Sequence, residues 1–302
     1  MIERLDFSYG TMDDFSSIFK LLEITGWGET EDDIRRVINN PDNKYILLCT
    51  PEGEAIAVTL AVKNGTLGFI GHVIVMPKFR GMGIGQEIMI EAINYLEHNG
   101  CKTIKLDAVK EAQTLYERVG FQFELNSLRF KLDLSTEEKI TSYKNKRKEF
   151  NQIYPVHNIK EDDLSQVFEL DSEIFECNRD NLLFSLFEEF PEYSFITRDT
   201  KDFLVGYSFG IYKNNILIIR AGVSDSIETT VNLIDAAITT AQSMNKVDFI
   251  SIGIPENSKW VVDVVKKLGF EQTSYSLRMY RGEKTTATIN PAIFAIGDPA
   301  KG

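Results

Sequence analysis

The stretch that decides the fold begins in an apolar run and ends in alternating glycines, and it reads Val73-Ile74-Val75-Met76-Pro77-Lys78-Phe79-Arg80-Gly81-Met82-Gly83-Ile84-Gly85. Apolar residues then recur at helical spacing until Gly100. The order of strand, glycine loop and helix start directs several backbone N–H groups to one point. Because unpaired amides and the positive end of a helix dipole favour negative charge, the stretch predicts a phosphate or pyrophosphate site.

Two common phosphate-binding loops do not fit these glycines. A P-loop requires a lysine and then a hydroxyl residue after its last glycine, whereas Gln86 and Glu87 follow here. A dinucleotide-binding loop requires Gly-x-Gly-x-x-Gly, whereas these glycines simply alternate. The pattern that remains is Arg80-x-x-Gly83-x-Gly85 behind a strand end. An ordinary helix start with permissive glycines is the alternative interpretation.

A second motif lies downstream of the loop. Residues 104–108 read as a buried strand, and residues 111–121 read as a short helix that a glycine ends, with the pattern Leu-Tyr-Glu-x-x-Gly-Phe. In this order, the two motifs resemble those of the GNAT superfamily of N-acetyltransferases. The resemblance implies acetyl-CoA as the acetyl donor, with no metal, and it implies these donor-binding residues: Val73, Val75, Arg80, Gly81, Met82, Gly83, Ile84 and Gly85.

The resemblance also implies a catalytic arrangement. In the family, acetyl-CoA lies between two splayed strands, and a backbone amide of the fourth strand holds the thioester carbonyl. Tyr116 matches the tyrosine that commonly lies beside the sulfur and protonates the leaving thiolate, although packing on the sheet is an alternative role. Many members carry an asparagine seven residues earlier, and this chain has Val109 there.

The acceptor amine must lose a proton before it attacks, so a base is needed. His72 is the titratable candidate on the strand that precedes the loop, and Asp107 lies at the end of the next strand, where ligand crevices tend to open. Either residue has a structural alternative. Trp27 and Glu29 lie in the segment that lines acceptor pockets in the family, and an exposed tryptophan beside a carboxylate suits an organic cation. Packing is the alternative role for Trp27.

Composition limits the possible functions. The length of 302 residues suits two domains. The net charge of −12 argues against nucleic acid as a partner and fits a cationic amine. Three scattered cysteines without metal or disulfide spacing favour a reducing, cytoplasmic location and no metal site. Neither a secretory signal nor a membrane-spanning apolar stretch is predicted.

The chain repeats itself at a fixed spacing. Phe121 and Phe270 each follow a glycine and are 149 residues apart, and the same spacing separates the Ser-Leu-Arg triplets that begin at Ser127 and Ser276. A constant spacing of about one domain length indicates two copies of one fold. We expect a mixed α/β fold in each copy, with a mainly antiparallel sheet flanked by helices, and hence tandem GNAT folds.

The second copy lacks the catalytic features of the first. Residues 221–229 replace the glycine loop and carry Asp225 and Glu228, whose charge opposes a pyrophosphate. Val265 takes the position that matches Tyr116. This half resembles the degenerate GNAT-like domain that follows an active GNAT domain in some prokaryotic chains. The expected segments are a catalytic domain at 1–134, a linker at 135–153, a degenerate domain at 154–282 and a tail at 283–302.

Three local features complete the expected architecture. Thr11 and Thr30 precede acidic residues and are predicted to cap the first two helices. The first copy is predicted to end in a hairpin with strands at 121–125 and 128–132. The apolar residues at 293–297 are predicted to dock in a groove between the domains. The expected function is acetylation of a primary amine of a small molecule by direct attack in a ternary complex, and a non-catalytic acyl-CoA-binding sensor or assembly module is the alternative.

Overall fold

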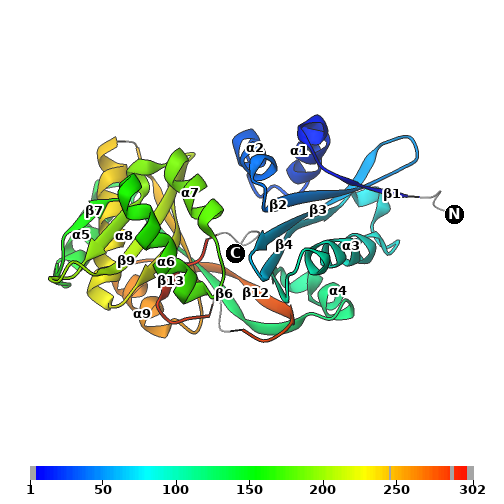
Figure 1. Ribbon diagram of the computed structural model, residues 1–302. Coiled ribbons are helices and arrows are strands. Elements are labelled where there is room, and N and C mark those ends of the chain that lie inside the picture. The colour runs from blue at the N-terminus through cyan, green and yellow to red at the C-terminus, as the bar shows by residue number, and fades with distance from the viewer. Residues whose placement is uncertain (1–4, 245, 286–288, 298–302) are drawn as a thin grey trace. The chain divides into compact units, whose positions relative to one another are not determined.

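The computed structural model describes residues 5–244, 246–285 and 289–297 (Figure 1). The chain divides into two compact units. Unit 1 comprises the described residues up to Glu124 together with Leu277–Thr285, and unit 2 comprises Leu125–Ser276 and residues 289–297. No helix in the described part of the chain is long and apolar enough to span a membrane.

Unit 1 is a mixed sheet with helices on both faces. Its elements in chain order are β1 (Asp6–Tyr9), α1 (Phe15–Glu23), α2 (Glu31–Asn39), β2 (Asn43–Cys49), β3 (Ala55–Asn64), β4 (Leu67–Val75), α3 (Ile84–His98), β5 (Thr103–Ala108) and α4 (Gln113–Arg118), with short 3-10 turns at Met12–Asp14, Pro77–Phe79 and Lys110–Ala112. The strand order is β1-β2-β3-β4-β5, and among these five strands, within the described residues, only β4 and β5 pair in parallel. Helices α1 and α2 cover one face, and α3 and α4 cover the other (Figure 1).

Local sequence explains where the first helices begin. Thr30 accepts a hydrogen bond from the Asp33 backbone, and the Asp33 carboxylate accepts one from the Thr30 backbone at 2.9 Å. Thr11 and Asp14 form the same reciprocal box before the first turn. Both predicted caps are therefore confirmed. Helix α3 buries its apolar stripe against β2, β3, β4 and β5, and this core fixes the helix start beside the strand ends.

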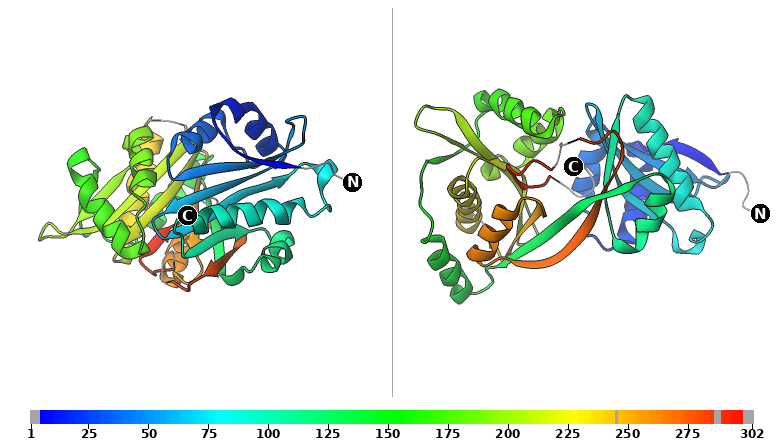
Figure 2. Two further views of the ribbon diagram at one scale, coloured as in Figure 1. Left: turned by 45° about the vertical axis from the view of Figure 1, so that its right-hand side comes forward. Right: turned by 90° about the horizontal axis from the view of Figure 1, so that it is seen from below.

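Unit 2 repeats this architecture (Figure 2). Its elements in chain order are α5 (Glu137–Arg147), β7 (Val156–Asn158), α6 (Leu164–Phe175), α7 (Asp180–Glu189), β8 (Phe195–Arg198), β9 (Leu204–Lys213), β10 (Ile216–Ser224), α8 (Ile227–Met244), β11 (Phe249–Pro255), α9 (Lys259–Leu268) and β13 (Ile293–Ala295), with 3-10 turns at Glu161–Asp163 and Pro191–Tyr193. Strand β10 begins 149 residues after β4, and the two strands share a positive φ at matching positions, 50° at His72 and 40° at Ala221. The predicted mixed α/β fold and its duplication are confirmed.

The predicted hairpin at residues 121–132 is wrong. One continuous strand, β6 (Gln122–Asp133), occupies the segment, and β12 (Glu271–Gly282) is its counterpart. Strand β6 starts in unit 1 and pairs with β11 in unit 2, whereas β12 starts in unit 2 and pairs with β5 in unit 1. Asn126 does not turn the chain, because its backbone N–H and side-chain amide donate to Glu256 at 2.8 and 2.7 Å. Each final strand therefore continues from one unit into the other.

Two further segments differ from expectation. Most of the expected linker is helix α5, which Thr136 caps at its start and whose Tyr143 is buried in the core of unit 2. Tyr143 donates to Asp235 at 2.8 Å, which explains why a lysine-rich segment becomes an ordered helix. The apolar tail forms β13, which pairs with β10 in unit 2, so the predicted groove between domains is not its docking site.

Candidate active site

Strands β4 and β5 pair over a short distance and then separate. Their parallel ladder joins Leu67–Phe69 to Thr103–Lys105, and no later residue of the two strands is paired across it in the described structure. Strand β4 nevertheless remains paired with β3 on its other side as far as Val75. The sheet of unit 1 therefore opens a split on the β5 side of β4, which is the splayed pair that the family resemblance implied.

The backbone of β4 presents polar groups to this split. The Met76 N–H donates to Ile56 in β3 at 2.9 Å, so by alternation the N–H and C=O of Val75 face the opposite edge. The Arg80 Nε–H donates to the Val75 carbonyl at 3.0 Å, which agrees with that direction. Val73 lies two residues earlier and faces the same edge. The two predicted valines thus direct their amides towards the open side of β4.

The glycine loop provides a second group of donors. Gly81 and Gly83 adopt φ values of 79° and 87°, and Gly83 occupies the N-cap position of α3 without a capping side chain. Across the described residues, no protein acceptor takes the N–H of Gly81, Met82, Gly83, Ile84 or Gly85. Five consecutive free amides at a helix start form an anion-binding site. The exposed guanidinium of Arg80 adds positive charge beside them.

The loop lies against α4, which carries Tyr116. A Cβ atom on Gly85 would lie 3.4 Å from Leu115 and 3.9 Å from Val75, so β4, the loop and α4 meet here. Tyr116 is buried, with 8% of its surface exposed, and burial raises the pKa of its phenol to about 12. Its hydroxyl donates to no residue in the described chain. Tyr116 is therefore a neutral donor available to a ligand.

His72 lies at a bulge in β4 and contacts two other predicted residues, Glu29 and Trp27. Thr59 stands opposite the bulge, where the register of β3 and β4 shifts. His72 Nε2 lies 3.5 Å from Glu29 Oε1, and the Trp27 ring centroid lies 6.1 Å from that of the His72 ring. His72 is 5% exposed, whereas Trp27 is 54% exposed, so the cluster extends from the strand to the surface.

Tyr45 completes this cluster and was not predicted. Its hydroxyl lies 3.2 Å from His72 Nδ1, and its ring stacks on the imidazole at a centroid distance of 6.0 Å. Tyr45 is almost fully buried in β2. No local motif marks it, because its contact to His72 depends on two strands that are not adjacent in the sheet. Contact with both imidazole nitrogens holds the ring in one orientation.

Asp107 has a different environment from the one expected of a base. Its carboxylate accepts from Arg278 Nε at 2.8 Å and from Arg278 Nη2 at 3.3 Å, and both side chains are buried. The two residues lie directly opposite each other in the β5–β12 ladder. A bidentate pair of this kind occupies both carboxylate oxygens and holds them against the Arg278 guanidinium. The geometry therefore supports a structural role for Asp107 and gives no support to the expected catalytic one.

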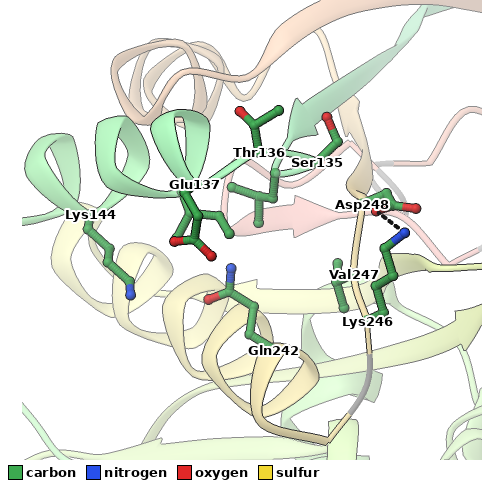
Figure 3. Close-up of a pocket in the computed structure, with 10 residues that line it drawn as sticks. Ser135, Thr136, Glu137, Lys144, Gln242, Lys246, Val247 and Asp248 are labelled. Carbon is green, nitrogen blue, oxygen red and sulfur yellow. Dashed lines mark ion pairs between the residues drawn. The ribbon is translucent and has the colours of Figure 1, made fainter.

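A separate cavity of 440 Å³ lies within unit 2 (Figure 3). Its lining comes from the start of α5, from α8 and from the segment that leads into β11. Lys246 and Asp248 form an ion pair at 3.4 Å on one side of it. None of the predicted site residues lines this cavity.

Comparison with known families agrees with this geometry. Residues 12–121 match the model of the acetyltransferase (GNAT) family, and residues 167–295 match the model of an acetyltransferase (GNAT) domain. Together the two matches cover well over half of the chain. The chain belongs to the GNAT acetyltransferases and contains two GNAT domains.

Solved structures show the same tandem fold. A putative acetyltransferase from Pyrococcus horikoshii matches with a TM-score of 0.77 at 18% identity, over 100% of this chain and 97% of its own. A GCN5-related N-acetyltransferase from Sphaerobacter thermophilus matches with a TM-score of 0.64 at 14% identity, over 95% and 99%. A tandem GNAT protein from the clavulanic acid biosynthesis pathway matches with a TM-score of 0.64 at 12% identity, over 93% and 99%. At these identities the likeness concerns the fold.

Proposed function

We propose that unit 1 transfers an acetyl group from acetyl-CoA to a primary amine of a small molecule, by direct attack in a ternary complex. The observation that carries the proposal is the set of five free amides at Gly81–Gly85, placed at the end of a strand whose neighbour has separated from it. A split between strands suits an extended chain with a charged end group. The pantetheine arm and pyrophosphate of acetyl-CoA have this form.

Backbone groups of unit 1 would hold the donor. The loop amides and the Arg80 guanidinium would bind the pyrophosphate, since fixed donors at a helix start favour anions without needing to rearrange. The edge amides of Val73 and Val75 would face the thioester. A backbone N–H aimed at the carbonyl oxygen stabilises the negative charge that develops there during attack.

The His72 cluster would receive the amine. Glu29 and the exposed face of Trp27 suit an ammonium group, through charge attraction and cation–π contact. His72 would take the proton before attack, because its imidazole is held between Tyr45 and Glu29 and lies on the strand that presents the thioester amides. The net charge of −12 favours a cationic acceptor over an anionic one.

Tyr116 would assist the leaving thiolate by hydrogen bonding. A phenol whose pKa is raised to about 12 is a weak acid, so donation of a hydrogen bond suits it better than full proton transfer. We expect Tyr116→Phe to lower kcat about 10- to 100-fold, because a hydrogen bond to a charged group contributes roughly 1.5–3 kcal/mol. Acetyl-CoA affinity should be unchanged in calorimetry.

The pH profile of kcat tests whether Tyr116 titrates in the working range. The raised pKa keeps the phenol protonated at all pH values below about 11, so it does not titrate in the working range. The pH profile of kcat for Tyr116→Phe should therefore have the wild-type shape at a lower height. A changed shape near neutral pH would show that Tyr116 titrates during the reaction.

Glu29 is expected to contribute to binding of the acceptor amine and not to binding of acetyl-CoA. Glu29→Gln should raise KM for the amine about tenfold, as expected for loss of one partly screened charge contact of about 1.4 kcal/mol. The KM for acetyl-CoA should not change. Glu31→Gln is the matched control, since Glu31 is exposed and pairs only with Arg35 among the ion partners in the described chain. Equal amine KM values for Glu29→Gln and Glu31→Gln would remove Glu29 from the site.

Release of the CoA thiol tests the function itself. The full chain is incubated with acetyl-CoA and a panel of diamines, amino sugars, amino acids and peptides, and N-acetyl products are identified by mass spectrometry. We expect release that depends on a small amine and yields its N-acetyl derivative. Binding of acetyl-CoA without release in the presence of any amine would instead favour a non-catalytic acyl-CoA-binding module.

A further inference from the structure

The split between strands recurs in unit 2, where the chain's own tail fills it. Strands β10 and β11 pair in parallel only over Ile216–Ile219 and Phe249–Ile252. Beyond that point β13 lies along β10 in antiparallel pairing, with Gly222 opposite Ala295 and Val223 opposite Ile293. In the described part of unit 1, no strand is inserted between β4 and β5.

The tail takes the backbone hydrogen bonds of both strands that border the split. Ser224 N–H donates to Ala292 at 3.0 Å, and Ala221 N–H donates to Ile296 at 3.3 Å. On the other side, the Ile296 N–H donates to Gly253 in β11 at 2.9 Å. Ser224 is the counterpart of Val75, 149 residues later. The amide that would face the thioester in unit 1 therefore binds a peptide carbonyl in unit 2.

Side chains of unit 2 fit this peptide closely. Ile293, Phe294 and Ala295 are completely buried. A Cβ atom on Gly222 would lie 2.4 Å from the Phe294 ring, and one on Gly253 would lie 2.7 Å from Ile296. The two glycines therefore leave the space that the tail side chains occupy.

Polar side chains bind the carbonyls at both ends of the tail. Ser258 Oγ donates to Ile293 at 3.0 Å, Trp260 Nε1 donates to Pro291 at 3.2 Å, and Arg220 Nη1 donates to Gly297 at 2.8 Å. Strand pairing with β10, one backbone hydrogen bond to β11 and space for the tail side chains together resemble strand addition to a sheet. The split between β10 and β11, called the slot below, thus has the features of a peptide-binding site.

The helix that follows β10 starts differently from α3, because a serine side chain caps its first turn. Ser226 Oγ accepts from the Thr229 N–H at 3.2 Å, and the Ser226 carbonyl accepts from the Thr230 N–H at 3.0 Å. Ser224 and Thr230 share a further side-chain hydrogen bond. The start of α8 is therefore capped by its own residues, whereas the start of α3 has a glycine there.

We propose that the split of unit 2 is a binding site for an extended apolar peptide, and that its ligand is residues 290–297 of the same chain. The peptide occupies the place that the pantetheine arm takes in unit 1, a comparison that rests on the function proposed above. Because the tail lies in this place, the two strands of unit 2 can stay separated without an acyl-CoA between them.

Cleavage of the folded chain tests the proposal without requiring a truncated chain to fold. A specific protease site is inserted between Thr285 and Ile289, and the purified full chain is then cut. Trp260 contacts the tail and is the only tryptophan once Trp27→Phe is introduced, so its fluorescence reports the occupied slot. We expect the cut tail to stay bound and the emission to change only when excess synthetic peptide 289–297 bearing a quencher replaces it.

A variant peptide provides the control. Replacing Phe294 by alanine in the peptide should weaken competition at least about a hundredfold, because a fully buried phenylalanine ring is then lost from the slot. Equal competition by both peptides, or loss of the tail on cutting with no change in Trp260 emission, would overturn the proposal. So would a second acetyl-CoA bound after the tail leaves. Failure of the proposed function would appear separately, as absence of acetyl-CoA binding to the uncut chain.

Discussion

Replacing Gly83 by valine is expected to weaken acetyl-CoA binding at least about a hundredfold. Gly83 has a φ of 87° at the N-cap of α3, and a β-branched residue is strained there by about 1–3 kcal/mol. Relief of that strain rotates the peptide groups on either side and turns their N–H groups away from the pyrophosphate. The measurement is calorimetry with acetyl-CoA on the folded variant.

Gly53→Val is the matched control for this change. Gly53 has a φ of 86°, and like Gly83 it has no atom within 4 Å of a built Cβ, but it lies in the turn between β2 and β3. Both variants should lose similar stability, and only Gly83→Val should lose acetyl-CoA. Equal affinity of the two variants would show that the loop amides do not bind the donor. Gly85→Ala is a weaker test, because its Cβ would point to Leu115 and not outwards.

His72→Asn is expected to lower kcat about 10²- to 10⁴-fold, the usual contribution of a general base. Asparagine tolerates the positive φ of 50° at this position and can still hydrogen-bond to Tyr45, so the bulge should remain. Acetyl-CoA affinity should be unchanged. The remaining rate should rise with pH, since more of the amine is then already deprotonated.

His98→Asn controls for the loss of a histidine elsewhere in unit 1. His98 lies at the exposed end of α3, and its Nδ1 lies 2.7 Å from the Asn94 carbonyl. Its kcat should match that of the wild type. If His72→Asn also turned over at the wild-type rate, the base would have to be another group or a water chain, and the cluster with Tyr45 and Glu29 would be structural.

Much of the fold could be predicted because its signals are local or periodic. The glycine loop, the threonine caps and the constant spacing of 149 residues are all present in the sequence itself. The loop's place at the start of α3 follows from the amphipathic pattern behind it. These features predicted the duplicated α/β fold and the position of the glycine loop between β4 and α3.

The remaining features depend on contacts between distant residues. The continuous strand β6 pairs with β11, more than a hundred residues away, so its local pattern of two short strands was misleading. Asp107 was assigned by its position at a strand end, but Arg278 lies opposite it from a distant strand. Tyr45 meets His72 only after β2, β3 and β4 have assembled. Pairing of this kind leaves no local pattern in a single sequence.

The binding place of the tail could not be predicted either, because it also depends on contacts between distant residues. Its apolar composition correctly predicted that residues 293–297 are buried. Its partner could not be predicted, because the split between β10 and β11 exists only where two strands separate. Gly222 and Gly253 leave space for the tail, but a glycine within a strand also occurs at bulges and at sharp bends, so the two glycines alone do not indicate a bound peptide.

Titration of the uncut wild-type chain with acetyl-CoA tests the central claim most directly. The free amides of Gly81–Gly85 and the open split occur in unit 1, whereas the start of α8 is capped and the split of unit 2 is filled. We therefore expect calorimetry to show one acetyl-CoA bound per chain, and the same binding to be lost in Gly83→Val. Two molecules bound per chain, or none, would contradict a single donor site in unit 1.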